Sequence, residues 1–243
     1  MDALPECAST NSELLRRAAA GAPSGSVVIA DRQTAGRGSR GRTWQSSPGA
    51  SLTFSLLWRF DTPLNCLAGL SLAVGVAVVR ALTACGASGV TLKWPNDILF
   101  GEAKLGGILV ELQGAEAYSL AVIGIGINLS LPPAFERQAF HLPPTALDQV
   151  LPALPERHFL FSRLLIALAQ VLDRFAAGGF AQLQDEWQAC HAWQDRQICL
   201  LREGQVVKAG VCRGADTDGA LLVQTVTGIE RCLSGDLSLR RVP

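Results

Sequence analysis

The sequence has no net charge, no paired cysteines and no metal-binding spacing. Its 21 basic and 21 acidic side chains cancel, which argues against broad electrostatic binding to nucleic acid or to an anionic membrane. The seven cysteines include no C-x-x-C pair, and the three histidines stand alone at 141, 158 and 191. This spacing fits neither a disulfide framework nor a zinc site, so we expect reduced cysteines, a cytoplasmic location and no metal held by the protein alone.

Targeting and membrane segments are also lacking. The N-terminal "MDALPECASTNSELL" is acidic and has no apolar core of signal-peptide length. The longest apolar run, Cys66 to Val79, covers fourteen residues, which is too short to span a bilayer. We expect it to form part of a buried helix and expect no membrane partner.

What is present is typical of a folded globule. Apolar residues make up 49% and charged residues 17% of the chain. In the first half, the patterns predict a short helix after a capping box at 10–13, strands at 24–33 and 51–58, an apolar helix from Leu64 to Cys85, a strand at 89–97, a hairpin over 98–112 and a central strand at 118–131.

The second half begins with a proline-rich connection at 132–155, with one helical turn near Ala146. Two amphipathic helices are predicted next, at 159–178 and 180–193. After Gln194, short β-rich runs alternate with Gly and Asp turns, which is typical of a small β-barrel of about fifty residues.

The loop "RQTAGRGSRGRTW" at 32–44 is the first of four candidate functional clusters. It contains four arginines and three glycines. The glycines provide free backbone N–H groups, and Arg37, Arg40 and Arg42 are forked donors suited to phosphate or carboxylate oxygens. The loop can therefore close over an anion, although a solvated basic turn or an RNA-binding Arg-Gly segment would have the same composition.

The second and third clusters are "KWPND" at 93–97 and "KLGGILVEL" at 104–112. Strand alternation puts Lys93 on the face opposite Trp94, and Pro95 ends the strand, so that Asn96 and Asp97 project from a turn. Taken singly, an Asn-Asp turn and a surface lysine beside a bulge are ordinary structural features.

The fourth cluster is "GIGIN" at 124–128. It lacks the third glycine of a dinucleotide-binding motif, and no helix is predicted after it. Alternating glycines in an apolar strand can open a slot for a ligand, or they can allow close packing of a helix. The sequence alone does not separate these two interpretations.

Together and in this order, the clusters resemble the biotin protein ligase family. The matching motifs are "STN" at 9–11, "QTAGRG" followed by "RGRTW", "KWPND", "KLGGILVEL", "GIGIN" and the C-terminal "GD…SLR" at 235–240. The resemblance implies an α+β fold: a mixed sheet flanked by helices, of the class II synthetase-like kind, in residues 1–190, and a small SH3-like β-barrel in 191–243. Only eight residues precede "STN", so we expect the monofunctional form, without a DNA-binding domain.

The family activity implies two steps. Biotin and ATP, with Mg²⁺, form biotinyl-5'-AMP and pyrophosphate, and the biotinyl group then passes to one lysine of a biotin carboxyl carrier protein. The resemblance leaves the oligomeric state open, with a homodimer formed edge to edge as one option. Lys104 and Arg37 are the candidates for neutralising the charge of the reacting groups.

The resemblance also implies which residues bind biotin and ATP, because these residues lie in the matched motifs. The ureido ring of biotin requires hydrogen-bond donors and acceptors, and its apolar chain can lie along the glycine strand and Trp44. The implied biotin-binding residues are Ser9, Thr10, Asn11, Gln33, Gly36, Arg37, Gly38, Ser39, Trp44, Lys104, Gly107, Gly124 and Gly126. The implied ATP-binding residues are Arg37, Arg40, Arg42, Trp44, Lys93, Asn96, Asp97 and Asn128.

The sequence departs from the family pattern at one position, and three other functions stay open. The family usually has a second arginine where this chain has Ser39, and we expect Arg40 or Arg42 to compensate in retaining the adenylate. A lipoate ligase or octanoyltransferase of similar fold is the nearest enzymatic alternative. The others are a non-catalytic biotin sensor and an Arg-Gly nucleic-acid module, the last disfavoured by the neutral charge.

Overall fold

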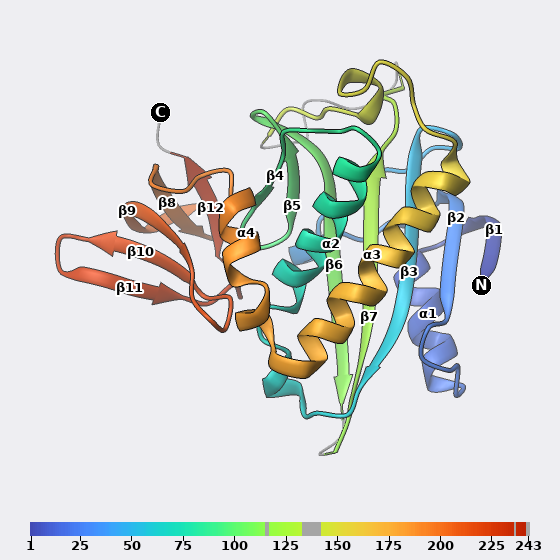
Figure 1. Cartoon of the computed structure of the whole chain (residues 1–243), viewed down its shortest axis with the longest axis horizontal. Helices are drawn as coiled ribbons and strands as arrows, with labels where there is room; N and C mark the ends of the chain where they lie inside the picture. Colours follow the sequence, from blue (N-terminus) through green and yellow to red (C-terminus); the bar gives the residue numbers. More distant parts are fainter. Residues whose placement is uncertain (115–116, 133–141, 236, 242–243) are drawn as a thin grey trace.

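The computed structural model contains a large mixed sheet beside a smaller antiparallel one (Figure 1), and it describes residues 1–114, 117–132, 142–235 and 237–241. The large sheet has seven strands in the order β1-β2-β3-β7-β6-β5-β4. Only the β1–β2 pairing is parallel. The α+β fold is therefore confirmed. The strands are β1 (Asp2–Cys7), β2 (Val27–Gln33), β3 (Ser51–Phe60), β4 (Val90–Lys93), β5 (Asp97–Phe100), β6 (Ala103–Gly114) and β7 (Ser119–Asn128).

The side chains of the large sheet alternate between two different faces. On β7, the central strand as predicted, Ile123, Ile125 and Ile127 enter the main core against α2 (Leu70–Ala84) and α3 (Arg157–Gly178), which cover this face in Figure 1. Val122 points the other way and packs with Leu14 of α1 (Thr10–Ala19). The short helix α1 covers only part of this face of the sheet, and Gly124, Gly126 and Asn128 of β7 line a cavity on the same face.

The apolar helix begins later than the sequence predicts. Leu64–Leu67 forms a 3₁₀ turn, and α2 starts only at Leu70. The break is at Gly69, which has φ +79° and lies so close to Phe180 that a side chain would collide with it. The stretch Leu64–Ala84 has a mean hydropathy of 1.9 and the length of a membrane span. Its helix α2 is packed between the sheet, α3 and α4, as expected of a core helix.

The start of α1 also differs from the prediction. The N-cap is Ser9, whose Oγ accepts from the backbone N–H of Ser12 at 3.5 Å, and not Thr10. The predicted capping carboxylate, Glu13, instead pairs with two arginines of the next turn. Starting the helix one residue earlier buries Thr10 and Asn11 against the sheet.

The second half follows the predicted order. A 3₁₀ turn at Leu147–Gln149 lies in the proline-rich connection, of which 133–141 are outside the described residues. Helix α3 ends at Gly178 as predicted, whereas the next predicted helix is divided into a 3₁₀ turn at Phe180–Gln182 and α4 (Gln184–Cys190). The small sheet has the order β11-β10-β9-β8-β12, from β8 (Gln197–Arg202), β9 (Gln205–Ala215), β10 (Leu221–Thr225), β11 (Gly228–Cys232) and β12 (Ser238–Arg241).

The two sheets are joined beside β4. The indole of Trp94 donates to the carbonyl of Gly219 at 3.0 Å, and the backbone N–H of Ala192 donates to the carbonyl of Leu92 at 2.9 Å. As a result β12, the outer strand of the small sheet, lies near the ends of β4 and β5 (Figure 1).

Candidate active site

The strand register brings the motif residues into rows on the α1 face of the sheet. Thr53 on β3 is paired with Gly126 on β7, which is paired with Gly107 on β6. Gly107 is in turn paired with Asp97 on β5, and Asp97 with Lys93 on β4. Because residues paired across neighbouring strands share a face, three of the motifs and Thr53 of β3 become one surface.

A cavity of about 370 Å³ lies over this surface. Its size is in the range of small-molecule sites. The predicted site residues that line it are Ser9, Thr10, Asn11, Gln33, Arg37, Gly38, Ser39, Arg42, Trp44, Lys93, Asn96, Asp97, Lys104, Gly107, Gly124, Gly126 and Asn128. Two predicted residues, Gly36 and Arg40, are not among the lining residues.

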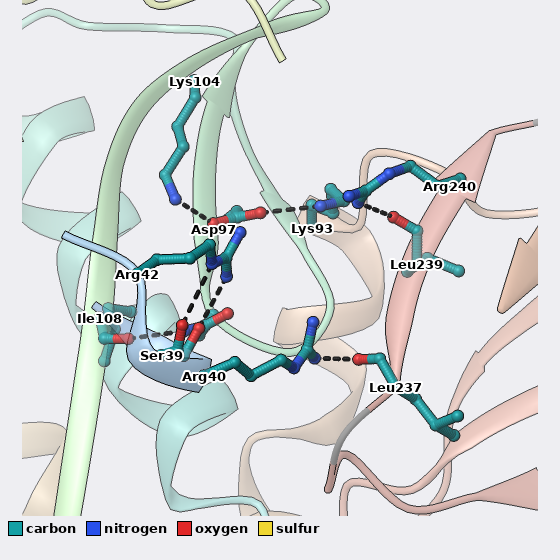
Figure 2. A network of polar contacts seen from close by, with 11 residues as sticks. Ser39, Arg40, Arg42, Lys93, Asp97, Lys104, Ile108, Leu237, Leu239 and Arg240 are labelled. Atoms are coloured by element: carbon teal, nitrogen blue, oxygen red, sulfur yellow. Dashed lines mark hydrogen bonds and ion pairs between the residues drawn. The ribbon is translucent and has the colours of Figure 1, made fainter. Parts of the chain in front are cut away.

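A lysine–aspartate–lysine triad forms one end of the cavity. Asp97 accepts from the ammonium of Lys93 at 2.7 Å and also from that of Lys104 (Figure 2). Burial alone would raise the pKa of Asp97, but the two ammonium groups hold it well below the usual range. The carboxylate is therefore ionised. Burial lowers the pKa of Lys93, whereas the ionised Asp97 raises it, so the contact with Asp97 is what favours the charged ammonium of Lys93.

Further cations line the cavity. Arg42 from the loop and Arg240 from β12 lie near the triad (Figure 2), whereas Arg37 binds Ser12 and Glu111 beside α1. Burial and then the nearby Arg42 guanidinium lower the pKa of Arg240 below its ordinary value, because both disfavour its charge. Among the described lining residues Asp97 is the one carboxylate, so this end of the cavity is suited to a polyanion.

The arginines of the loop at 32–44 point in different directions. The guanidinium of Arg42 donates to Ser39 Oγ at 2.7 Å and to its carbonyl at 3.1 Å, and it faces the triad (Figure 2). Arg40 points the other way and donates to the carbonyls of Gly235 and Leu237 in the C-terminal segment. Arg37 donates to Glu111 Oε1 on β6 at 2.7 Å. Of the two arginines expected to compensate for Ser39, Arg42 is the one that lines the cavity.

The end of the cavity beside α1 presents mainly uncharged polar groups, with the Arg37–Glu111 pair next to them. Gln33 accepts the backbone N–H of Thr10 at 2.7 Å, and both residues are almost fully buried. Trp44 Nε1 donates to Thr53 Oγ1 at 3.2 Å, and the indole lies against Gly126 of β7, where it lines the cavity. This arrangement provides a polar end, an apolar middle and a cationic end.

The glycines of "GIGIN" have a different role from an open slot. A side chain at Gly124 would collide with the amide of Asn11, and one at Gly126 with the indole of Trp44. These glycines therefore allow two cavity-lining side chains to approach the strand closely. Gly107 is the more open position, because a Cβ there meets only Lys104 at 3.5 Å and the Asn96 carbonyl at 3.8 Å.

Two of the predicted nucleotide-binding amides are held by backbone. Asn96 Nδ2 donates to the carbonyl of Ile108 at 2.8 Å, and Asn128 Nδ2 donates to that of Thr145 at 2.9 Å. Within the described parts of the chain, no hydrogen bond uses the side-chain oxygen of either amide. Asp97 does not project from a turn as predicted but begins β5 and is buried.

Sequence reasoning missed several contributors. Arg240 lies in the "SLR" motif that supports the resemblance, but nothing in that motif indicates that it reaches the cavity of the other sheet. Asp236, of the same motif, is outside the described residues. Ser55 and Glu111 sit at face positions of β3 and β6, which the two-residue period could have indicated.

Comparisons with known proteins agree with this geometry. A model of the Biotin/lipoate A/B protein ligase family matches residues 5–128. The bifunctional ligase/repressor BirA of Salmonella typhimurium is 35% identical over 98% of this chain and 73% of its own length. The biotin--[acetyl-CoA-carboxylase] ligase of Mycobacterium tuberculosis is 34% identical over 91% of this chain and 82% of its own length.

A solved structure extends the likeness to three dimensions. The biotin protein ligase from Aquifex aeolicus, in complex with biotin and ATP, superposes with a TM-score of 0.84 at 30% identity, covering 99% of this chain and 98% of that one. The relatives and the solved structure match over nearly the whole chain, and the family model includes the motifs from 9 to 128 that line the cavity. The chain belongs to the biotin protein ligase family.

Proposed function

We propose that this chain is an ATP-dependent biotin--[acetyl-CoA-carboxylase] ligase. It would join biotin to ATP as biotinyl-5'-AMP, with release of pyrophosphate, and then transfer the biotinyl group to a lysine of a biotin carboxyl carrier domain. The observation that supports this proposal best is a single cavity with a neutral polar end and a cationic end joined by an apolar middle. Those three parts match a cyclic urea, a polyphosphate and an acyl chain.

The first step requires two anions to meet. The carboxylate oxygen of biotin attacks the α-phosphorus of ATP, and the bond to the pyrophosphate oxygen breaks. Lys104 and Arg37 would offset the charge at the reacting groups, with Arg42 and Arg240 beside the phosphates. Lys93 is almost fully buried, and it would act mainly by holding Asp97 and hence Lys104 in place.

The second step requires the adenylate to survive until the acceptor arrives. The lysine amine of the carrier attacks the acyl carbon and AMP leaves with its phosphate oxygen. The loop at 36–43 lies along the cavity. The contact of Arg40 with Leu237 would keep it over the anhydride, the Arg42–Ser39 contact would fix its own shape, and the closed loop would exclude water.

Mg²⁺ would arrive with the nucleotide. Among the described residues, no three His, Cys, Asp or Glu side chains gather into a possible metal site. Asp97, the carboxylate in the cavity, already accepts from two lysines. The donor set therefore fits a cation held chiefly by phosphate oxygens, where it would offset part of the ATP charge.

Further parts of the proposal follow from the site. Residues 1–190 would form the catalytic domain and 191–243 a smaller domain that contributes Arg240. A cytoplasmic location is proposed because ATP, the carrier protein and reduced thiols occur together there. A homodimer stays a prediction, for which the outer edge of β1 is the candidate surface.

One experiment tests the function. The protein is incubated with ATP and Mg²⁺ and with either biotin or lipoate, and the acyl-adenylate is detected by mass while pyrophosphate release is followed. We expect biotinyl-5'-AMP and, after addition of a carrier domain, a biotinylated lysine. If the lipoyl adenylate forms in preference to biotinyl-5'-AMP, the substrate is lipoate and not biotin. Thermal stabilisation by biotin without pyrophosphate release would instead favour a sensor.

A further inference from the structure

The linker between α4 and β8 passes beside the lysine–aspartate–lysine triad. It runs along the outer edge of β4, where His191 forms a parallel bridge with Leu92 and the backbone N–H of Ala192 donates to the carbonyl of Leu92 at 2.9 Å. The next linker residue, Trp193, therefore lies close to Lys93 of β4. Trp193 is almost fully buried, and it is not among the residues that line the cavity.

The ammonium group of Lys93 lies over the indole ring of Trp193. Its nitrogen is 5.3 Å from the centroid of the ring, which is within the range of a cation–π contact. The same nitrogen donates to Asp97 Oδ2 at 2.7 Å (Figure 2). The ammonium group is therefore held by a ring face and by a carboxylate, and both favour its positive charge.

Lys93 depends on these contacts because its surroundings oppose its charge. Its side chain is only 5% exposed, so it has lost most of its hydration. Burial is the largest cause that lowers the pKa of Lys93, and the nearby Arg240 and Lys104 lower it further. Asp97 raises that pKa, but its carboxylate also binds Lys104.

An aromatic ring suits this place better than a second carboxylate would. The face of an indole attracts a cation through its quadrupole and has no net charge. It can therefore stabilise the ammonium of Lys93 without cancelling the positive charge that this end of the cavity presents to a polyanion. Another aspartate or glutamate beside Lys93 would cancel part of that charge.

We propose that Trp193 is a positioning residue for the adenylation step. Its ring holds the charged Lys93 in place, and Lys93 holds Asp97. Asp97 in turn orients Lys104 towards the reacting groups. The inference rests on the proposed function and adds to it a residue of the linker that acts on the reaction only through the triad.

Trp193→Leu tests this role, because it removes the ring and keeps an apolar side chain. The rate of pyrophosphate release is measured in a single turnover with saturating biotin and ATP, per biotin-binding site, so that unfolded protein is not counted. We expect the rate to fall about tenfold, the effect of losing a desolvated cation–π contact. The dissociation constant of biotin should change by less than about twofold, since Trp193 does not line the cavity. An unchanged rate would overturn the proposal.

A double-mutant cycle with Lys93→Met shows whether the ring acts through the ammonium group. Lys93→Met removes that group and leaves Asp97 paired with Lys104. Trp193→Leu then has no cation to release, so the double variant should be no more than about twofold slower than Lys93→Met alone. A further tenfold loss in the double variant would mean that Trp193 acts by packing, and the proposal would fail.

Trp187→Leu is the matched control. Trp187 is also almost fully buried and stacks on His191 of the same linker, but it does not line the cavity. Its loss should lower the free energy of unfolding and leave the rate per biotin-binding site within about twofold of the wild type. Equal rate losses in Trp187→Leu and Trp193→Leu would trace both to disturbed packing and contradict the positioning role.

Trp193→Phe provides the same test if Trp193→Leu does not fold. Phenylalanine keeps a ring face that attracts cations more weakly than an indole. The rate should therefore fall about threefold, and this loss should disappear in the Lys93→Met background. A loss that persists there overturns the inference. If the wild type forms biotinyl-5'-AMP and the Trp193 variants keep its rate, only the positioning role fails. If the wild type forms no adenylate, the proposed function fails and the positioning role with it.

Discussion

Asp97 is the residue through which the two lysines of the site depend on each other. It is almost enclosed by protein, and yet it stays ionised because ammonium groups approach it from two sides. Removing Lys104 would leave Asp97 paired with Lys93, so the buried charge would still be balanced. The site would lose one positive charge without exposing an unpaired ion.

This balance leads to a prediction for Lys104→Ala. We expect the rate of pyrophosphate release to fall by about 100-fold or more, as is usual when a group that stabilises developing charge is removed. The free energy of unfolding should change by about 1 kcal/mol or less, since Lys104 is partly exposed and its partner keeps Lys93. Pre-steady-state adenylation and urea denaturation measure the two effects.

Lys208→Ala provides the comparison for that variant. Lys208 lies on β9, pairs with Glu230 and is not among the residues that line the cavity. It should retain wild-type adenylation. Near-normal pyrophosphate release in Lys104→Ala would remove Lys104 from the reaction.

At the scale of residues, the sequence identified side chains better than it identified their contacts. Seventeen of the predicted residues line the cavity, because the motifs combine cations, amides and glycines in a recognisable order. Ser55 and Glu111, which bind Asn11, were missed because neither lies in the cavity, and their importance depends on which atoms they meet across the sheet. Such contacts are set by register, which a single sequence does not specify.

The loop at 36–43 shows how one element separates three arginines. Arg40 has φ +60°, a conformation that a non-glycine side chain rarely adopts, and its guanidinium is bound to the C-terminal segment. The turn at Arg40 sends Arg42 back towards Ser39 and the cavity. The loop is therefore bound to the C-terminal segment through Arg40, while Arg42 adds positive charge to the cavity.

The position of Arg42 predicts how well Ser39 is tolerated. We expect Ser39→Arg to change the release of free biotinyl-5'-AMP by less than about twofold, because the Arg42 guanidinium already lies beside residue 39. Arg42→Ala should increase that release by about tenfold, the effect of losing one charge-assisted hydrogen bond. The adenylate is separated from the protein by filtration and measured by mass.

Arg202→Ala is a suitable control, since Arg202 is an exposed residue of β8 and does not line the cavity. A large drop in release for Ser39→Arg would mean that Arg42 does not compensate for the missing arginine.

Among the elements, strands β2 to β12 and the end of α3 followed the sequence patterns. Strand β1 was not predicted, and the helix predicted at 180–193 is divided. The starts of α2 and α1 also differ from the patterns. The apolar pattern continues through Gly69, but the close approach of Phe180 requires a left-handed turn there. The predicted cap moved to Ser9 because Glu13 has two arginines within reach. Both differences come from tertiary or competing contacts that local patterns do not contain.

At the scale of the molecule, both sheets contribute to one cavity. The large sheet supplies the triad, while β12 of the small sheet supplies Arg240 and the adjoining segment binds Arg40. The sequence predicted the small β-rich unit but left its role open. Contacts beside β4 fix the position of the small sheet. The site therefore also depends on the junction between the two sheets.

His191 lies at that junction. Its ring stacks on Trp187 with 4.5 Å between centroids, and Nδ1 lies 4.0 Å from the sulfur of Cys212 on β9. Among the described residues, Nε2 makes no hydrogen bond of standard geometry, and Gln194 is the polar side chain that acts on the ring. Burial lowers the pKa of His191 from 6.5 to about 4. The folded protein therefore keeps this ring neutral at mildly acidic pH.

This lowered pKa predicts that the folded protein loses stability in acid, because of His191 at the junction between the sheets. Between pH 6.5 and about 4 the unfolded chain binds a proton at His191 that the folded chain does not, so stability falls as the pH falls. From pH 7.5 to 5 this contribution is about 2 kcal/mol. His191→Phe, which can still stack on Trp187, should lose that part of the slope in urea denaturation. His158→Gln, at an exposed histidine, should keep it. Equal slopes in wild type and His191→Phe would show that the ring is protonated in the folded state and that the junction tolerates its charge.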